Sequence, residues 1–211
     1  MTAREMTARH ATIAVLVPCY NEEATIGAVV RDFRKHLPSA DIYVYDNNSK
    51  DKTVERAREA GAIVRKEERQ GKGNVVRRMF ADIEADIYIL VDGDDTYDAS
   101  AAPTLARKLI DEGLDIVSGR RIATGHDAYR RGHVWGNHML TGLTATMFRV
   151  KLLDMLTGYR VMSRRFVKSF PFTAEGFGIE TELSVHAVRL MMPFAEVDTP
   201  YKERPVGSVS K

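Results

Sequence analysis

Short apolar runs alternate with amphipathic segments along most of the chain. Residues 12–17 and 86–91 are β-branched or apolar at most positions, a pattern typical of strands buried on both faces of a parallel sheet. Residues 26–37 instead carry apolar side chains three and four positions apart, which predicts an amphipathic helix that Pro38 ends. The same reasoning predicts strands at 12–17, 41–45, 62–66, 86–91, 115–118, 159–162 and 195–200, and helices at 26–37, 52–60, 74–83, 100–112, 134–149 and 179–190.

The alternation of strands and helices, with mostly short connections, predicts an α/β fold. We expect a Rossmann-like, doubly wound and mostly parallel sheet flanked by helices. At 211 residues the chain is long enough to bury one substantial core. Residues 12–211 are expected to form a single domain, and residues 1–11 a disordered N-terminal arm.

Polar residues follow the first predicted strand. Pro18 interrupts the strand, and Asn21 carries a side-chain oxygen of the kind that accepts a hydrogen bond at the start of a helix. Glu22 and Glu23 come next, where the helix dipole favours negative charge. The sequence therefore predicts that Asn21 caps the N-terminus of the following helix.

Charge and cysteine content exclude several classes of protein. Lys and Arg number 31 and Asp and Glu number 29, so the formal net charge of +2 does not indicate a nucleic-acid-binding protein. The single cysteine, Cys19, cannot form an internal disulfide and is consistent with a reducing compartment. We find no apolar run long enough to cross a bilayer and no signal-peptide pattern.

The strand at 86–91 ends in a cluster of carboxylates. Asp92, Asp94 and Asp95 follow it directly, with Gly93 among them. Open α/β sheets bind their ligands at the carboxyl ends of parallel strands. Neighbouring carboxylates repel one another, and a hard divalent cation shared with a phosphate, Mg²⁺ or Mn²⁺, would relieve that repulsion. The alternative is a solvated acidic turn, because Asp and Gly are common turn residues.

Three further strand ends are predicted to lie at the same edge of the sheet. The first strand is followed by residues 18–22, the second by Asp46, and the third by a loop in which Lys72 stands between two glycines. A carboxylate suits a base or ribose, a lysine suits phosphate, and glycines let backbone amides approach an anion. The Lys72 loop lacks the upstream glycine of a Walker motif, and no Gly-x-Gly-x-x-Gly follows the first strand, which argues against a dinucleotide-binding oxidoreductase.

Several motifs, in a fixed order, carry a resemblance to a known family. The first four are Pro18-Cys19-Tyr20-Asn21-Glu22, Asp46-Asn47-Asn48-Ser49-Lys50-Asp51-Lys52-Thr53, Gly71-Lys72-Gly73 and Asp92-Gly93-Asp94. The later segments that agree with them are Ser118-Gly119-Arg120, Thr157-Gly158-Tyr159-Arg160, Glu180-Thr181-Glu182-Leu183 and Gly207-Ser208-Val209-Ser210-Lys211. From Ile13 to its last residue, the chain resembles family 2 glycosyltransferases of the GT-A fold. Within that family it is most similar to dolichyl-phosphate mannosyltransferases and bacterial polyprenyl-phosphate glycosyltransferases.

The resemblance implies inverting, metal-dependent transfer of a hexose from a nucleotide-diphospho-sugar, either GDP-mannose or UDP-glucose. The residues it assigns to donor binding are Pro18, Tyr20, Glu22, Val44, Asp46, Lys72, Asp92, Gly93, Asp94, Arg120, Arg204 and Lys211. Asp94 is the first expected ligand of Mg²⁺ or Mn²⁺ and Asp92 the second, and the metal would neutralise the leaving diphosphate. The residues expected to act in catalysis are Asp92, Asp94, Arg120 and Arg131. Asn47 stands where the family more usually has a second Asp, so the contact to the base is expected from Asp46.

The acceptor implied by the resemblance is a polyprenyl or dolichyl phosphate, which would place the protein on the cytoplasmic face of the cytoplasmic membrane, peripheral to its surface. A lipid phosphate is already ionised and attacks without a base, so the protein must supply cations to hold it. The basic residues available for the two phosphate groups are Arg120, Arg121, Arg130, Arg131, Arg160, Arg204 and Lys211. The alternative for Arg130 and Arg131 is a solvated basic loop.

Three other functions stay open at this point. A GT-A transferase with a soluble or saccharide hydroxyl acceptor would need a base, and Glu180 or Glu182 would supply it. A sugar-1-phosphate nucleotidyltransferase is disfavoured, because no glycine-rich loop containing Arg follows the first strand. A non-catalytic nucleotide-sugar-binding module would be expected to lack the metal carboxylates, whereas Asp92 and Asp94 are both present.

Overall fold

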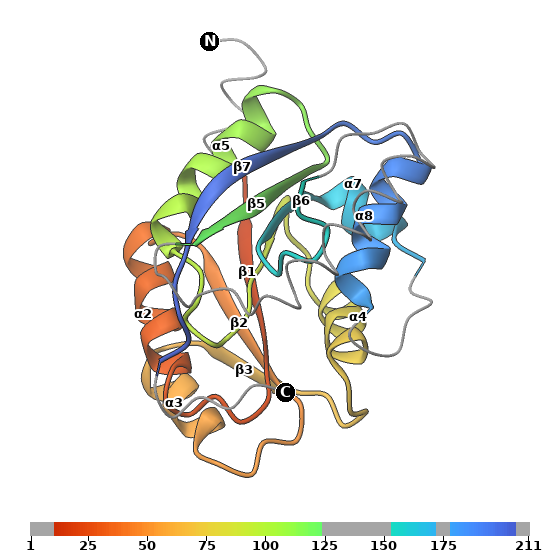
Figure 1. Ribbon diagram of the computed structural model, residues 1–211. Helices are drawn as coiled ribbons and strands as arrows, with labels where there is room; N and C mark the ends of the chain where they lie inside the picture. The colour runs from red at the N-terminus through yellow and green to blue at the C-terminus, as the bar shows by residue number, and fades with distance from the viewer. Residues whose placement is uncertain (1–10, 124–152, 172–177, 206–211) are drawn as a thin grey trace.

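The structure is a computed structural model that describes residues 11–123, 153–171 and 178–205. Within these residues, seven strands form one sheet in the order β3-β2-β1-β4-β6-β5-β7 (Figure 1). The mostly parallel α/β sheet predicted from the sequence is confirmed. The strands are β1 (Ile13–Cys19), β2 (Asp41–Asp46), β3 (Ile63–Lys66), β4 (Ile87–Leu90), β5 (Ile116–Ala123), β6 (Arg160–Ser163) and β7 (Phe194–Tyr201).

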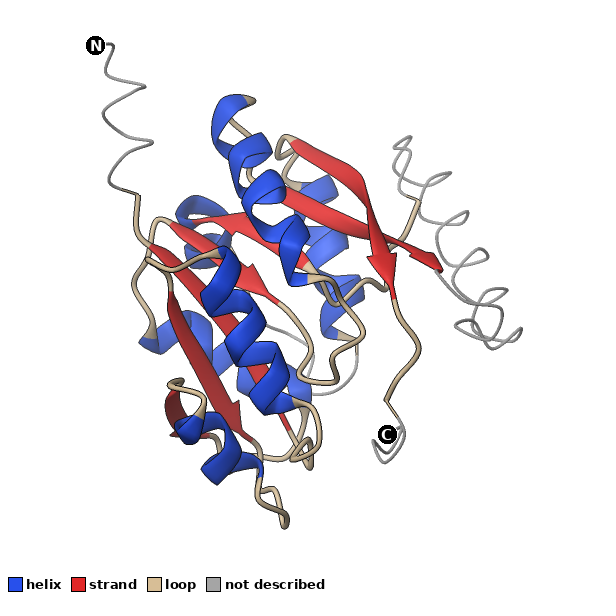
Figure 2. Cartoon of the chain, turned by 90° about the vertical axis from the view of Figure 1, so that its left-hand side faces the viewer, coloured by secondary structure: helices blue, strands red, loops and turns tan. Residues whose placement is uncertain are grey.

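Helices cover both faces of the sheet. Helices α2, α3 and α5 lie on one face, and α4, α7 and α8 lie on the other (Figures 1 and 2). The short helix α7 has no counterpart among the predicted elements, and the helix predicted at 134–149 lies outside the described residues, as do residues 1–10 of the predicted arm. The helices are α2 (Ile26–His36), α3 (Thr53–Glu59), α4 (Lys72–Asp82), the 3₁₀ turn η1 (Ala99–Ala101), α5 (Ala102–Asp111), α7 (Arg164–Ser169) and α8 (Ile179–Arg189).

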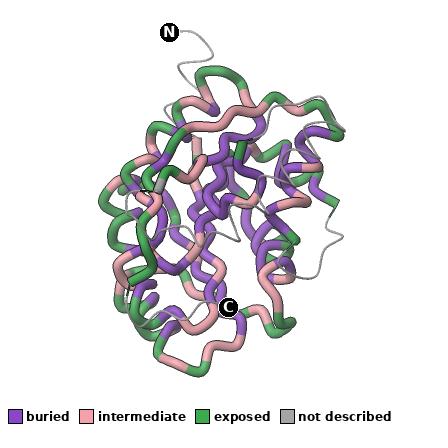
Figure 3. Tube along the Cα trace, viewed as in Figure 1, coloured by how far each residue is buried: buried purple, intermediate pink, exposed green. Residues whose placement is uncertain are grey.

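Strand β1 shows why the sheet is apolar on both sides. Successive side chains of a strand point to opposite faces. Val15 and Val17 belong to the core cluster under α2, α3 and α5, whereas Ala14 and Leu16 belong to the cluster under α4, α7 and α8. Figure 3 shows the resulting buried band through the middle of the molecule. Among the described residues, no helix combines the length and the apolar character that crossing a membrane requires.

Strand β6 departs from the parallel pattern of the sheet. It lies between β4 and β5 and pairs antiparallel with both, with Arg160 opposite Leu90 on one side and Ser118 on the other. Because β6 runs in the opposite direction, its first residue lies at the carboxyl end of β4. The segment that precedes β6 therefore reaches the edge where the predicted functional residues gather.

The predicted N-cap at Asn21 is wrong. Helix α2 begins at Ile26, and its N-cap residue is Thr25, whose side chain makes no capping hydrogen bond. Asn21 has a φ of 55°, in the left-handed region that Asn tolerates better than most residues. Its Oδ1 accepts a hydrogen bond from the Lys50 amide at 2.8 Å. Asn21 thus joins the loop after β1 to the loop after β2.

Candidate active site

A cavity of about 460 Å³ lies at the carboxyl edge of the sheet. Its walls come from the ends of β1 and β4, the loops that follow β2 and β3, strand β5, the first turns of α4 and α8, and the segment after β7. The lining residues are Pro18, Cys19, Tyr20, Glu22, Asn47, Gln70, Gly71, Lys72, Val75, Asp92, Gly93, Asp94, Arg121, Glu180 and Arg204.

The structure brings together most, though not all, of the residues predicted for donor binding. Val44 is fully buried in the hydrophobic core and Asp46 accepts a hydrogen bond from the Ser49 amide, and neither of them lines the cavity. Arg131 and Lys211 lie outside the described residues. The predicted residues that do line the cavity are Pro18, Tyr20, Glu22, Lys72, Asp92, Gly93, Asp94 and Arg204.

Asp94 is a buried carboxylate whose two oxygens have different partners. Thr96 donates to Oδ1 through its hydroxyl at 2.6 Å and through its amide at 3.2 Å. Arg204, from the segment after β7, donates from Nη2 to Oδ2 at 2.6 Å. Only 3% of Asp94 is exposed, so both contacts act where solvent screens them weakly. The carboxylate is thereby held with Oδ2 against a cation.

Lys72 joins two further carboxylates of the cavity, those of Asp92 and Glu180. It is the first residue of α4, and its Nζ lies 2.5 Å from Asp92 Oδ1 and 2.5 Å from Glu180 Oε1. Burial on its own would lower the pKa of Lys72, but the two carboxylates outweigh it and raise that pKa above its ordinary value. Lys72 therefore stays charged and connects β4, α4 and the first turn of α8.

Glycines allow the strand ends to approach this closely. A Cβ placed on Gly158 would lie 2.4 Å from Asp92 Oδ2, and one placed on Gly93 would lie 2.7 Å from Cys19 Sγ. Any side chain at Gly158 would thus displace the carboxylate that Lys72 holds. Cys19 is buried beside Gly93 and belongs to the hydrophobic core.

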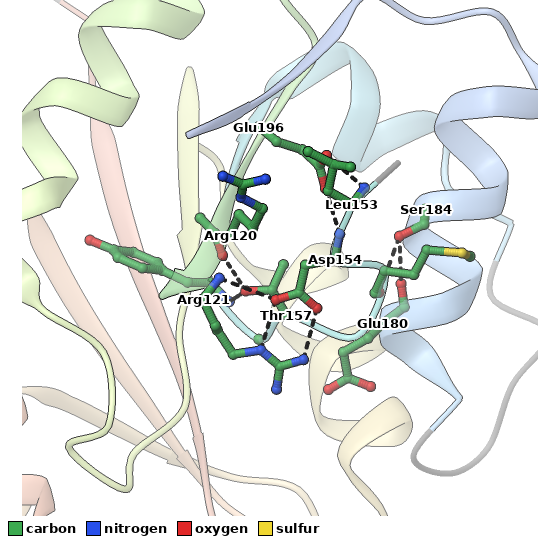
Figure 4. A network of polar contacts seen from close by, with 12 residues as sticks. Arg120, Arg121, Leu153, Asp154, Thr157, Glu180, Ser184 and Glu196 are labelled. Carbon is green, nitrogen blue, oxygen red and sulfur yellow. Dashed lines mark hydrogen bonds and ion pairs between the residues drawn. The ribbon is translucent and has the colours of Figure 1, made fainter. Parts of the chain in front are cut away.

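Two adjacent arginines of β5 have different surroundings. Arg120 donates to Asp198 on β7 from Nε at 2.5 Å and from Nη2 at 2.6 Å, and it does not line the cavity. Arg121 does line it, and its guanidinium binds both carboxylate oxygens of Asp154, at 2.8 and 2.7 Å. Figure 4 shows the two side chains leaving the strand in opposite directions, with Arg121 on the side of the Glu180 carboxylate. The alternation of a strand was the signal that distinguishes them.

Arg160 was grouped with the phosphate-binding arginines, but in the structure its guanidinium binds three backbone carbonyls and the hydroxyl of Ser184. It is 1% exposed, and its guanidinium donates to the carbonyls of Met155, Thr157 and Glu180 at 2.7, 3.1 and 2.9 Å. Burial lowers the pKa of Arg160 from its ordinary value. The residue therefore connects the segment before β6 to the first turn of α8, where it holds the backbone carbonyl of Glu180.

The carboxylates of the cavity suit a hard divalent cation. Asp92 and Asp94 offer oxygen donors, which Mg²⁺ and Mn²⁺ prefer. The described residues contain no group of three or more His, Cys, Asp and Glu side chains arranged to hold a metal ion. A cation bound at Asp94 would take its remaining ligands from water or from a bound phosphate, and it would share the carboxylate with Arg204.

Comparison with known proteins gives a consistent result. The family described as glycosyl transferase family 2 matches residues 14–170. Protein RfbJ of Shigella flexneri is 55% identical over 122 residues, which are 57% of this chain and 95% of that protein. The dolichyl-phosphate hexose transferase of Haloferax volcanii is 32% identical over 192 residues, covering 91% of this chain and 83% of that protein.

A solved structure supports the same assignment of the fold. Glucosyl-3-phosphoglycerate synthase from Mycobacterium tuberculosis superimposes with a TM-score of 0.78 and 26% sequence identity, covering 98% of this chain and 76% of the other. That protein was crystallised with Mn²⁺, uridine diphosphate and glucosyl-3-phosphoglycerate.

Replacing Lys72 tests the charge balance of the cavity without any ligand. Lys72→Met leaves Asp92 and Glu180 without the ammonium between them, and we expect the free energy of unfolding in urea to fall by about 3 kcal/mol. The double variant Lys72→Met/Glu180→Gln should recover part of that loss, because it removes one of the two repelling charges.

The matched control for this experiment is Lys108→Met. Lys108 pairs with Glu112 at 2.6 Å on the exposed surface of α5, where an ion pair contributes less than about 1 kcal/mol. Equal losses for the two single variants, or no recovery in the double variant, would contradict the structural account of Lys72.

Proposed function

The chain belongs to glycosyl transferase family 2, and we propose that it transfers a hexose from a nucleotide-diphospho-sugar to a polyprenyl or dolichyl phosphate. It is a glycosyltransferase of the GT-A fold. The observation that carries the proposal is the cavity at the carboxyl edge, where Asp92 and Asp94 face the cationic side chains of Lys72, Arg121 and Arg204. Such a mixture suits a nucleoside diphosphate bound through a divalent cation, with a second anion beside it.

The donor would lie along the cavity from β1 to α8. Pro18, Tyr20 and Glu22 line the end proposed for the nucleoside, and Asp46, just outside the lining, keeps its proposed role at the base. The crystal complex of the mycobacterial synthase with Mn²⁺ and uridine diphosphate supports a uridine nucleotide, and UDP-glucose and GDP-mannose are both proposed donors. Gly93 would let the ribose and phosphates approach the backbone.

Transfer would proceed by direct displacement with inversion. An oxygen of the acceptor phosphate forms a bond to the anomeric carbon, the bond from that carbon to the diphosphate breaks, and its electron pair leaves with the nucleoside diphosphate. Mg²⁺ or Mn²⁺ held by Asp94 and Asp92 would supply charge neutralisation for that leaving group. Arg204 would assist from its position beside Asp94. Of the other residues proposed for the phosphates, Arg120 keeps a proposed role by its motif, and Arg131 and Lys211 lie outside the described residues.

The acceptor end of the cavity is proposed at Arg121. Its guanidinium is oriented by the two-point contact with Asp154, and this geometry suits a phosphate oxygen better than a hydroxyl. The name of the Haloferax relative, a dolichyl-phosphate hexose transferase, supports a lipid phosphate. A lipid acceptor would bring the protein to the cytoplasmic surface of a membrane, and that location is part of the proposal.

One observation favours a second candidate, transfer to a saccharide hydroxyl. The Glu180 carboxylate lines the cavity and would be placed to remove a proton from such an acceptor. Glu180 is at the same time the ion-pair partner of Lys72 at 2.5 Å, so its carboxylate is already bound by the ammonium that also holds Asp92. The lipid phosphate, which needs no base, is therefore the first choice.

A transfer assay tests the proposal directly. With labelled UDP-glucose or GDP-mannose, Mn²⁺ and a short polyprenyl phosphate in detergent, we expect label to move into the organic phase. Asp94→Asn should slow this transfer by about a hundredfold, or ~3 kcal/mol, because it removes a charge that stabilises the leaving group.

The matched control is Asp95→Asn, the same change at the next residue, which does not line the cavity. It should transfer at close to the normal rate, since Asn tolerates its φ of 59°. Label found only in a saccharide acceptor, with transfer abolished by Glu180→Gln, would support the second candidate instead.

Arg204 and a metal ion would compete for the Asp94 carboxylate. Replacing Arg204 should therefore change the affinity for Mn²⁺ alone and the affinity for Mn²⁺ with UDP in opposite directions. Arg204→Met should bind Mn²⁺ alone about tenfold more tightly, a change of ~1.4 kcal/mol, because Asp94 loses its competing cation. The same variant should bind Mn²⁺ with UDP less tightly, because the diphosphate loses a cation.

Electron paramagnetic resonance of free Mn²⁺ would measure the first effect and calorimetry the second. Lys202→Met, an exposed lysine on the same segment, controls for the loss of one positive charge and should change neither. A fall or no change in the affinity for Mn²⁺ alone would contradict the shared use of Asp94.

A further inference from the structure

One side chain fixes the loop between β3 and α4. Asn47 follows β2, and its Nδ2 donates to the carbonyls of Glu67 and Arg69, at 2.8 Å in both cases. Its Oδ1 accepts from the Gly71 amide at 2.7 Å and from Gln70 Nε2 at 3.3 Å. The Asn47 amide therefore holds the loop at three backbone positions and one side chain, and Asn48 adds a contact to the Glu68 carbonyl.

The amide of Asn47 has no hydrogen-bonding capacity left over. A primary amide has two N–H donors and two lone pairs on its oxygen, and the four contacts use all of them. Two carbonyls on one side and a backbone N–H on the other also determine which end of the group is nitrogen. Asn47 is 3% exposed, and its own backbone N–H donates to Cys19 O at the end of β1, at 2.8 Å.

Aspartate cannot replace asparagine in this arrangement. A carboxylate would keep the contact with the Gly71 amide but would place negative charge against the carbonyls of Glu67 and Arg69. The buried position would make that repulsion costly. The departure of this chain from the family's more usual aspartate at position 47 therefore has a structural consequence in the loop that leads to Lys72.

We propose that Asn47 is a positioning residue that acts through Lys72. Gly71 has a φ of 124°, which an L-residue rarely adopts, and Lys72 follows it as the first residue of α4. The Gly71 amide held by Asn47 is therefore one residue from the side chain that reaches Asp92 and Glu180 at 2.5 Å. A shift of the loop moves the ammonium out of register with both carboxylates.

The positioning role rests on the proposed function, since it assigns Lys72 to the donor cavity, but its first test does not. Hydrogen exchange followed by mass spectrometry reports the loop itself. In Asn47→Asp and in Asn47→Ala, we expect the amides of residues 67–72 to exchange about tenfold faster or more, because buried hydrogen bonds are lost. Peptides from β1 and α2 should exchange as in the unaltered protein.

The matched control is Asn48→Asp, the same chemical change at the next residue. Asn48 Nδ2 donates to the Glu68 carbonyl at 2.9 Å in an exposed setting, where water replaces a lost contact. Its loop should keep nearly normal exchange rates. Unchanged exchange in both Asn47 variants would overturn the proposal, and if Asn47→Asp fails to fold, Asn47→Ala decides the outcome.

A double-mutant cycle on donor turnover separates positioning from a general structural role. Asn47→Ala should lower kcat/KM by about tenfold or more, and Asn47→Ala/Lys72→Met should be no worse than Lys72→Met within about twofold, because the two residues act as one unit. Fully additive losses would overturn the proposal. The unaltered protein could turn over no nucleotide sugar while Asn47→Ala still speeds hydrogen exchange in residues 67–72. That result would contradict the proposed function but not the role of Asn47 in holding the loop.

Discussion

Neutralisation of clustered carboxylates is the constraint on which this site depends. Asp92, Asp94 and Glu180 all line one cavity, and without cations they would repel one another. Lys72 neutralises part of this charge between Asp92 and Glu180, and Arg204 does so beside Asp94. These contacts join strands, helices and the segment after β7 that are far apart in sequence. The same ion pairs therefore balance the charge of the site and hold these segments together.

The same constraint explains why the fold suits transfer of a sugar. A nucleotide-sugar brings two phosphates to the edge of the sheet, and a divalent cation would come with them. The cationic side chains already present there would then have anions other than Asp92 and Asp94 to bind. The GT-A fold supplies the edge, while the residues on it decide which groups are bound.

Much of the fold was predictable because its elements are periodic. The buried parallel strands around Leu16 and Ile89, and the amphipathic helices between them, carry strong local patterns that the structure confirms. The antiparallel direction of β6 was not predictable, because the hydrophobic pattern of so short a strand is the same whether the strand runs parallel or antiparallel to its neighbours. The N-cap predicted at Asn21 failed because an asparagine suits a left-handed turn as well as a cap. In the site, the positions of Lys72, Asp92 and Asp94 after predicted strands were enough to predict that they lie at one edge of the sheet. The hydrogen bonds of Asn47 could not be predicted, because they join residues about twenty positions apart in sequence.

The central claim is that this cavity binds a nucleotide-sugar through a divalent cation. The most direct measurement is calorimetric titration of UDP-glucose and of GDP-mannose into the protein, first with Mn²⁺ and then with EDTA. We predict that one of the two binds with Mn²⁺ and that EDTA abolishes its binding, which would identify the donor base. Equal binding with and without EDTA would contradict the role of Asp92 and Asp94, and no binding of either nucleotide under any condition would contradict the proposed function itself.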